Sequence, residues 1–186
     1  MKKITTSIET FLYFYPCTVA LVGARLEDRL NFMSCAWHTA LSSNPPLFGV
    51  MLAKKRFTHR LISEAREFTV NFIPFESVKL SAQMGRRSGG EIDKIKEFQV
   101  RVAPSKVIRS PIIEEAYVSF ECKLIRTEPF GDHDLFVGEI LAVHEEPDSF
   151  DAAGLLNISK VRPLLYMGCD MYVTVNPDTL NRVLPD

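Results

Sequence analysis

Short runs of apolar and β-branched residues, separated by turn residues, recur in the first part of the chain. They cover residues 18–24, 47–53 and 68–73, and an Asn-Pro-Pro turn at 44–46 precedes the second run. Runs of this length between turn signals are typical of buried β-strands. We therefore expect these three segments to be strands.

Apolar residues at helical spacing interrupt this pattern of strands. They predict a helix over residues 58–66, and Thr58 is in the position of its N-cap. Two further short helices are predicted over residues 76–84 and 91–98, with a loop of arginine, serine and glycine at 86–90 between them.

The later part of the chain returns to strand patterns. Residues 117–127 alternate between apolar and polar side chains, residues 135–144 do so less regularly, and a tight connection at 129–134 joins them. A last strand is predicted over residues 164–171. Many strands with a few short helices predict a mainly β fold, a barrel with helical insertions, and argue against a doubly wound α/β sheet.

Composition narrows the class of protein. The chain has 186 residues, 46% of them hydrophobic and 24% charged, which suits one domain over residues 1–186 with a substantial core. A net charge of −1 gives no basic field for nucleic acid or an anionic membrane. No apolar run reaches the roughly 18–20 residues of a membrane span, and polar residues interrupt the N-terminal segment where a signal peptide needs apolar ones. We expect a cytoplasmic protein.

The four cysteines, Cys17, Cys35, Cys122 and Cys169, form no C-x-x-C pair. In a domain of this size they are expected to be thiols rather than disulfides. Cys35 and His38 resemble half of a zinc site, but no second ligand pair follows at metal spacing, so no metal is predicted.

Candidate chemistry is concentrated in residues 28–59. Polar residues that can hold a phosphate flank a short apolar strand around Trp37, the only tryptophan; they are Asn31, Ser42, Ser43, Arg56 and Thr58. An arginine binds a phosphate with two parallel hydrogen bonds, and a helix beginning after Arg56 offers free N–H groups and a positive dipole end.

The strand segment at residues 33–37 is suited to binding a flat ring. Its backbone can hydrogen-bond the edge of a flat ring, and the small Ser34 and Ala36 allow the ring to approach. A flat apolar slot beside an anion site is what flavin mononucleotide (FMN) requires.

Each of these residues also has a simpler explanation. Trp37 could belong to the core, Thr58 could only cap a helix, Arg56 could be solvated, and Ser42 and Ser43 could start a turn. Cys35 lies in the proposed ring-lining strand, where a small buried side chain is favoured over a redox group. The combination in one short window is what favours FMN.

The chain resembles the flavin reductase-like, FMN-binding split-barrel family, and its flavoredoxin-like branch in particular. In the central window the matching residues are Asn31-x-Met33-Ser34-x-Ala36-Trp37, Ser42, Pro45-Pro46 and Arg56-x-Thr58. Other matches, between about residues 10 and 172, are Pro16-x-Thr18-Val19, Phe68-x-Val70-Asn71, Ser88-Gly89, Asp93-Lys94, Phe98, Pro111-Ile112-Ile113-Glu114-Glu115-Ala116, Glu121-Cys122, Gly131-Asp132-His133-Asp134 and Val137-Gly138-Glu139.

The resemblance implies a mainly β, Greek-key split barrel with a few short α-helices and a bound FMN. It places His133 near the open face of the flavin, as the candidate catalytic residue. It implies that the ring is lined by Asn31, Phe32, Met33, Ser34, Cys35, Ala36 and Trp37, and that the phosphate is held by Ser42, Ser43, Arg56 and Thr58, with His59 close by.

The resemblance also implies a homodimer with FMN near the subunit interface. An aromatic N-terminal cluster is compatible with such an interface, or with a cap on the chain's own barrel; its members are Phe11, Tyr13, Phe14 and Tyr15.

The expected activity is electron transfer from NAD(P)H through FMN to free flavin, a ferric complex or a redox protein. Without a G-x-G-x-x-G motif, NAD(P)H is expected to bind only transiently. Two alternatives stay open: a flavoredoxin-like electron carrier that does not oxidise nicotinamide, and a barrel that binds another ligand. The absence of a G-x-S-x-G or Cys-His signature disfavours hydrolase chemistry.

Overall fold

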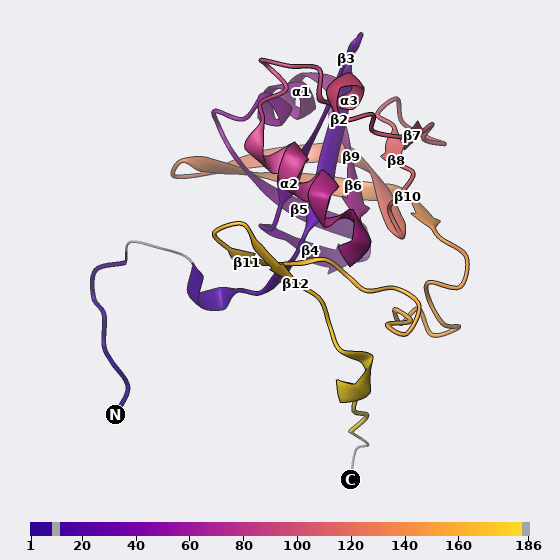
Figure 1. Ribbon diagram of the computed structural model, residues 1–186. Helices are drawn as coiled ribbons and strands as arrows, with labels where there is room; N and C mark the ends of the chain where they lie inside the picture. The colour runs from indigo at the N-terminus through magenta and orange to yellow at the C-terminus, as the bar shows by residue number, and fades with distance from the viewer. Residues whose placement is uncertain (9–11, 184–186) are drawn as a thin grey trace.

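The computed structural model describes residues 1–8 and 12–183. Its largest sheet consists of β2 (Ala20–Leu26), β3 (Arg29–Cys35), β4 (His38–Ser43), β5 (Pro46–Ala53), β6 (Glu67–Phe72), β9 (Val118–Phe130) and β10 (His133–Glu145). These seven strands lie in the order β3-β2-β6-β9-β10-β5-β4, and every neighbouring pair is antiparallel (Figure 1). The prediction of a mainly β fold is confirmed.

The two edge strands of this sheet, β3 and β4, are consecutive in the chain. Ala36 and Trp37 form the link between them, and the Met51 N–H donates to the Trp37 carbonyl at 2.8 Å. Because the link is only two residues long, the sheet must curl until its two edges come close together. The barrel does not close, since β3 and β4 are not paired with each other. The two linking residues therefore lie at the opening of a split barrel.

Two smaller sheets and three α-helices complete the fold. The small sheets are β1 (Cys17–Thr18) with β11 (Leu165–Gly168) and β12 (Met171–Val173), and β7 (Val102–Ala103) with β8 (Ile112–Ile113). Figure 1 shows the helices together in the upper half of the view, with the β11–β12 hairpin below them; they are α1 (Phe57–Ala65), α2 (Val78–Arg86) and α3 (Lys94–Glu97). The 3₁₀ turns are Leu12–Phe14, Phe75–Ser77 and Pro177–Thr179.

The apolar core lies on both faces of β2. Val22 packs in one cluster with Leu61 and Ile62 of α1, whereas Leu21 packs in a second cluster with Met84 of α2. Alternate side chains of a strand point to opposite faces, so a strand covered on both sides is apolar throughout. This explains why residues 18–24 read as a continuous apolar run.

Several predicted boundaries are corrected. Arg56, not Thr58, is the N-cap of α1, because the Thr58 hydroxyl accepts a hydrogen bond from the side chain of Asn31 instead of capping the helix. The helix expected over residues 91–98 is limited to α3, since Asp93 caps its N-terminus by accepting from the N–H groups of Ile95 and Lys96. The strand expected around Trp37 ends at Cys35.

The last predicted strand is in fact a hairpin. Gly168, Cys169 and Asp170 all have positive φ and turn the chain between β11 and β12. Gly168 and Asp170 are residue types that favour such a turn, whereas cysteine rarely adopts this conformation. Among the helices of the described residues, none is long and apolar enough to cross a membrane.

Candidate functional site

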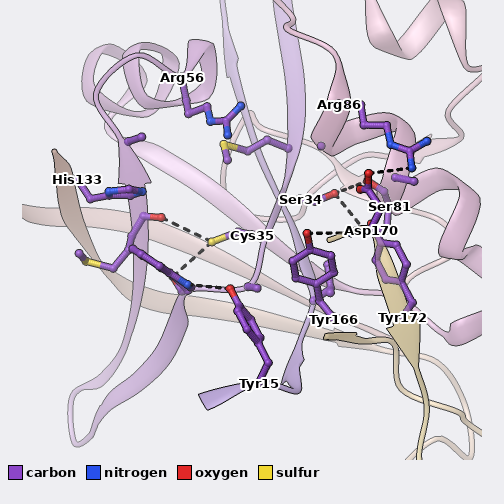
Figure 2. A pocket seen from close by; sticks show the side chains of 18 residues that line it. Tyr15, Ser34, Cys35, Arg56, Ser81, Arg86, His133, Tyr166, Asp170 and Tyr172 are labelled. Atoms are coloured by element: carbon purple, nitrogen blue, oxygen red, sulfur yellow. Dashed lines mark hydrogen bonds and ion pairs between the residues drawn. The ribbon is translucent and has the colours of Figure 1, made fainter. Parts of the chain in front are cut away.

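A cavity of about 280 Å³ lies at the opening of the barrel (Figure 2). The end of β3, the β3–β4 link, β5, α2 and the three-stranded sheet all contribute to it. It is lined by Tyr15, Val19, Met33, Ser34, Cys35, Ala36, Trp37, Met51, Ala53, Arg56, Ser81, Ala82, Gly85, Arg86, His133, Tyr166, Asp170 and Tyr172.

One wall of this cavity is the link between the two edge strands. The Trp37 indole N–H donates to the Tyr15 hydroxyl at 3.0 Å, and the Trp37 ring lies 4.8 Å from the His133 ring, measured between centroids. The small side chains of Ser34 and Ala36 leave the backbone accessible beside these rings. The wall therefore carries two aromatic rings, tilted by 37° to each other, beside the end of β3.

Tyrosines form an adjoining wall. The ring centroids of Tyr15 and Tyr166 are 5.6 Å apart, and those of Tyr166 and Tyr172 are 5.2 Å apart. Burial raises the pKa of Tyr15 and Tyr172, so both hydroxyls stay protonated at neutral pH. Together the two walls make an aromatic slot, the name we use for this cavity.

A second hollow, of about 260 Å³, adjoins the slot. The two cavities share Met33, Ser34, Arg56 and Gly85, so they form one continuous groove. We call this second hollow the cationic end. Its lining includes one carboxylate, that of Glu91, and four basic side chains, those of Lys55, Arg56, Arg87 and Lys94. None of these four forms an ion pair with a carboxylate of the described residues.

Lys94 is the most buried of these cations. Its side chain is 2% exposed and its ammonium donates to the Met84 carbonyl at 2.8 Å. Burial, with a smaller contribution from the nearby Arg56 charge, lowers the pKa of Lys94 from 10.5 to about 8. A buried cation without a carboxylate partner is costly, and an anion bound in this hollow would offset that cost.

Asn31 and the loop after α2 complete the cationic end. The Asn31 side-chain amide donates to the Thr58 hydroxyl at 2.6 Å, while its carbonyl oxygen is buried without a hydrogen-bond partner. Gly89 lies directly against that oxygen, since a Cβ at this position would be 2.1 Å away from it. The loop is further held by Arg29, which donates to the Gly89 carbonyl at 3.1 Å. An unsatisfied acceptor in a polar hollow is suited to a ligand hydroxyl.

Most of the site residues proposed from the sequence lie along this groove, namely Asn31, Met33, Ser34, Cys35, Ala36, Trp37, Arg56, Thr58 and His133. His133 begins β10 opposite Ala53, and its Nδ1 lies 2.8 Å from Asp132 Oδ1, which orients the imidazole ring. This hydrogen bond is the main reason that the pKa of Asp132 is lowered.

The structure places four of the proposed residues elsewhere. Phe32 points to the opposite face of β3, into the core with Leu21, because side chains alternate along a strand. Ser42 and Ser43 lie at the far end of β4, outside both parts of the groove. His59 turns to Asp134, with 2.8 Å between Nε2 and Oδ2.

Cys35 contacts the slot as a protonated thiol. Its Sγ donates to the Trp37 carbonyl at 3.3 Å, and burial raises its pKa to about 12. The four cysteines are free thiols, and the described residues contain no cluster of three or more potential metal ligands. The thiol thus acts as a small buried side chain.

The sequence reasoning missed side chains that come from distant segments. Tyr166, Tyr172, Ser81 and Arg86 carry no local signal, because their role depends on the docking of α2 and the β11–β12 hairpin. Lys94 did have a signal in the Asp93-Lys94 match.

Comparison with known proteins decides the family. Residues 12–174 match the sequence model of the flavin reductase like domain. The chain belongs to the flavin reductase-like family. It is similar to an FMN-binding protein from Thermus thermophilus solved with 1-cyclohex-2-enone, with 38% identity, a TM-score of 0.87 and coverage of 98% of this chain and 99% of that chain.

Two other similar proteins are a flavoredoxin and an FMN reductase. Flavoredoxin from Methanosarcina acetivorans is 32% identical with a TM-score of 0.85, and the match covers 99% of this chain and 96% of that chain. The FMN reductase (NADH) RutF from Stutzerimonas stutzeri is 27% identical over 113 residues, 61% of this chain and 62% of RutF. The flavin reductase-like split barrel is thus shown both by the curled, unclosed sheet and by these relatives.

Proposed function

We propose that this protein binds FMN in the groove and acts as a flavin oxidoreductase. Electrons pass from NAD(P)H through FMN to free flavin, a ferric complex or a redox protein. The observation that supports this most is the groove itself, an aromatic slot that continues into a hollow lined by four cations without an ion-pair partner among the described residues. The FMN-binding relative at 38% identity supports the same cofactor.

The residues present fit the parts of FMN. A phosphate monoester carries nearly two negative charges, which the buried Lys94 and the Arg56 guanidinium would balance. The free carbonyl oxygen of Asn31 would accept a hydrogen bond from a ribityl hydroxyl. The two hollows together fall within the roughly 300–1,000 Å³ of ordinary ligand sites.

Bound FMN would supply two-electron chemistry, with N5 of its ring as the hydride acceptor. The chain supplies position and charge. Backbone groups of Ser34, Cys35 and Ala36 would bind the edge of the ring and stabilise the negative charge that reduction brings there. His133, oriented by Asp132, lines the slot in which a donor would stack on the ring. The donor and ring need to be held about 3–3.5 Å apart.

A second candidate function is an electron carrier fed by a partner protein rather than by nicotinamide. Its support is the 32% identity to a flavoredoxin over nearly the whole chain. The same FMN site serves both functions, so the difference lies in whether a dihydronicotinamide can enter the slot.

One experiment tests the proposal and separates the two functions. The visible spectrum of the purified protein is recorded, with FMN added if needed, and NADH and NADPH are then added without oxygen. A flavin band that bleaches with either nucleotide is the expected result. A band that bleaches only with dithionite indicates the carrier, and a protein that takes up no FMN contradicts both.

The proposal includes a homodimer and a cytoplasmic location. Tyr13 and Phe14 are 74% and 53% exposed and lie next to Tyr15, whose ring belongs to the slot. A second subunit covering these aromatic residues would therefore lie close to the flavin. Light scattering is expected to give twice the mass of the chain. Phe11, the fourth residue of the aromatic N-terminal cluster, lies outside the described residues.

A further inference from the structure

An ion pair crosses the rim of the aromatic slot. Arg86, at the end of α2, lies 3.1 Å from Asp170, in the turn between β11 and β12, measured between Nη2 and Oδ2 (Figure 2). Both side chains line the slot and both are more than half exposed, 60% and 55%. Of the five Lys and Arg side chains that line the groove in the described chain, Arg86 is the one paired with a carboxylate.

The turn holds Asp170 in this position at a conformational cost. Cys169 and Asp170 have φ values of 51° and 60°, in the left-handed region that costs energy for residues other than glycine. The Asp170 N–H donates to the Tyr166 hydroxyl at 3.4 Å, which ties the turn to the tyrosine wall. The carboxylate is therefore presented to Arg86 directly beside the aromatic surface.

Arg86 does not line the cationic end, where we propose that the FMN phosphate binds. The neighbouring Arg87 lines the cationic end instead, together with Lys55, Arg56 and the buried Lys94. Four cations are thus available there for one phosphate, whereas Arg86 lines the slot, on the side of Tyr166 and Tyr172.

We infer that Arg86 recognises an anionic group, a phosphate or a carboxylate, of the second substrate that enters the slot. Asp170 occupies Arg86 until that group displaces it. This inference rests on the proposed function, since it assigns a selectivity residue to the same site.

An exposed ion pair such as that of Arg86 and Asp170 has low stability. Such pairs contribute little because water screens them, so exchanging one carboxylate for another anion costs little. The Arg86 guanidinium contacts Asp170 through one nitrogen, whereas it can offer two parallel N–H donors to a ligand carboxylate or phosphate. A neutral ligand gains nothing from Arg86, and an anionic one must compete with Asp170, so the pair sets the selectivity of the site.

Two donors with the same reacting ring test this inference. NADH carries a diphosphate, whereas 1-benzyl-1,4-dihydronicotinamide is neutral. Each donor transfers one hydride, which is two electrons with one proton, to FMN, and its ring leaves as the nicotinamidium cation. The measured quantity is the rate of FMN reduction by low NADH divided by the rate with the neutral donor. In Arg86→Met this ratio is expected to fall about tenfold, the effect of one charge-assisted hydrogen bond. In Asp170→Asn the ratio is expected to rise, because the competing carboxylate is gone.

Inhibitors distinguish the two sources of the anion. With the neutral donor, inhibition by ADP-ribose that weakens in Arg86→Met indicates a phosphate. Inhibition by benzoate but not by benzamide, with the same dependence on Arg86, indicates a carboxylate.

Matched variants control for unspecific effects. Arg126 forms a comparable exposed pair with Glu128 on β9, at 3.3 Å, outside the groove, and Arg126→Met is expected to leave the ratio unchanged. Arg86→Lys, which keeps the charge but not the fork, is expected to recover part of the ratio.

The outcomes separate this inference from the proposed function. If the FMN-loaded Arg86→Met variant keeps the wild-type ratio, or if NADH reduces neither variant nor wild type, and if inhibition by ADP-ribose and by benzoate does not depend on Arg86 either, the inference is overturned while FMN binding stands. If no FMN binds, the proposed function fails, and the inference with it.

Discussion

The two halves of the groove differ in how their charges are balanced. In the cationic end, Lys94 is buried, and within the described residues no carboxylate pairs with any of the four cations. At the rim of the slot, Arg86 is exposed and already paired with Asp170. An unpaired, buried charge suits a ligand that stays bound, whereas an exposed pair suits one that exchanges. The difference fits a resident cofactor at one end and a transient substrate at the other.

The largest effect is expected from removing the buried charge of the cationic end. Lys94→Met keeps the length of the side chain but not the ammonium, and the FMN dissociation constant should rise by about 100-fold, from lost charge-assisted contacts. Fluorescence titration with FMN measures it. The control is Lys96→Met, an exposed lysine of the same helix. Equal affinities in the two variants would remove Lys94 from the phosphate site.

The next largest effect is expected in the loop that closes the same end. In Gly89→Ala the new methyl group would meet the Asn31 carbonyl oxygen at 2.1 Å, so the loop must shift, at a cost of about 2 kcal/mol. FMN affinity and the free energy of unfolding should both decrease. Gly90→Ala is the matched control, because its nearest neighbour atoms are 3.5 Å away. A Gly89→Ala variant that binds FMN like the control would contradict the closed loop.

A pH effect should be confined to the cationic end. The pKa of Lys94 is lowered from 10.5 to about 8 in the folded protein without ligand. Above pH 8 the ammonium loses its proton, so FMN affinity should fall by up to about tenfold per pH unit. Between about pH 8 and 10.5 the unfolded chain binds the extra proton, so the stability of the FMN-free protein should increase with pH.

Titrations with FMN and urea unfolding of the FMN-free protein across this pH range measure the two trends. Both should disappear in Lys94→Met. Trends that persist in this variant would have to come from another group.

The smallest effect is expected in the slot. Tyr15→Phe removes the hydroxyl that accepts from the Trp37 indole at 3.0 Å, and stability should fall by about 1 kcal/mol. Chemical unfolding followed by Trp37 fluorescence measures this. Tyr13→Phe, at a side chain 74% exposed, is the control and should match the wild type. A loss of FMN affinity in Tyr15→Phe as large as in Lys94→Met would erase the contrast between the two ends.

The sequence by itself determined the strands and the local chemistry. Apolar runs and alternation identified most strands of the large sheet, since burial on one or both faces leaves a direct mark on the pattern. Arg56 and Thr58 could be recognised because they are neighbours at the start of one helix. The strand that bears Asn31, Met33 and Ser34 could be recognised for the same reason, as its residues are adjacent in the chain.

Only the tertiary structure decided which side chains complete the site. Phe32 points into the core and Asn31 into the groove, because side chains alternate along β3. Ser42 and Ser43 lie at the end of β4, away from the groove. Tyr166, Arg86 and Asp170 were brought together from segments far apart in the chain. Contacts of this kind depend on how the hairpin and α2 dock on the barrel, a packing outcome that no local pattern encodes.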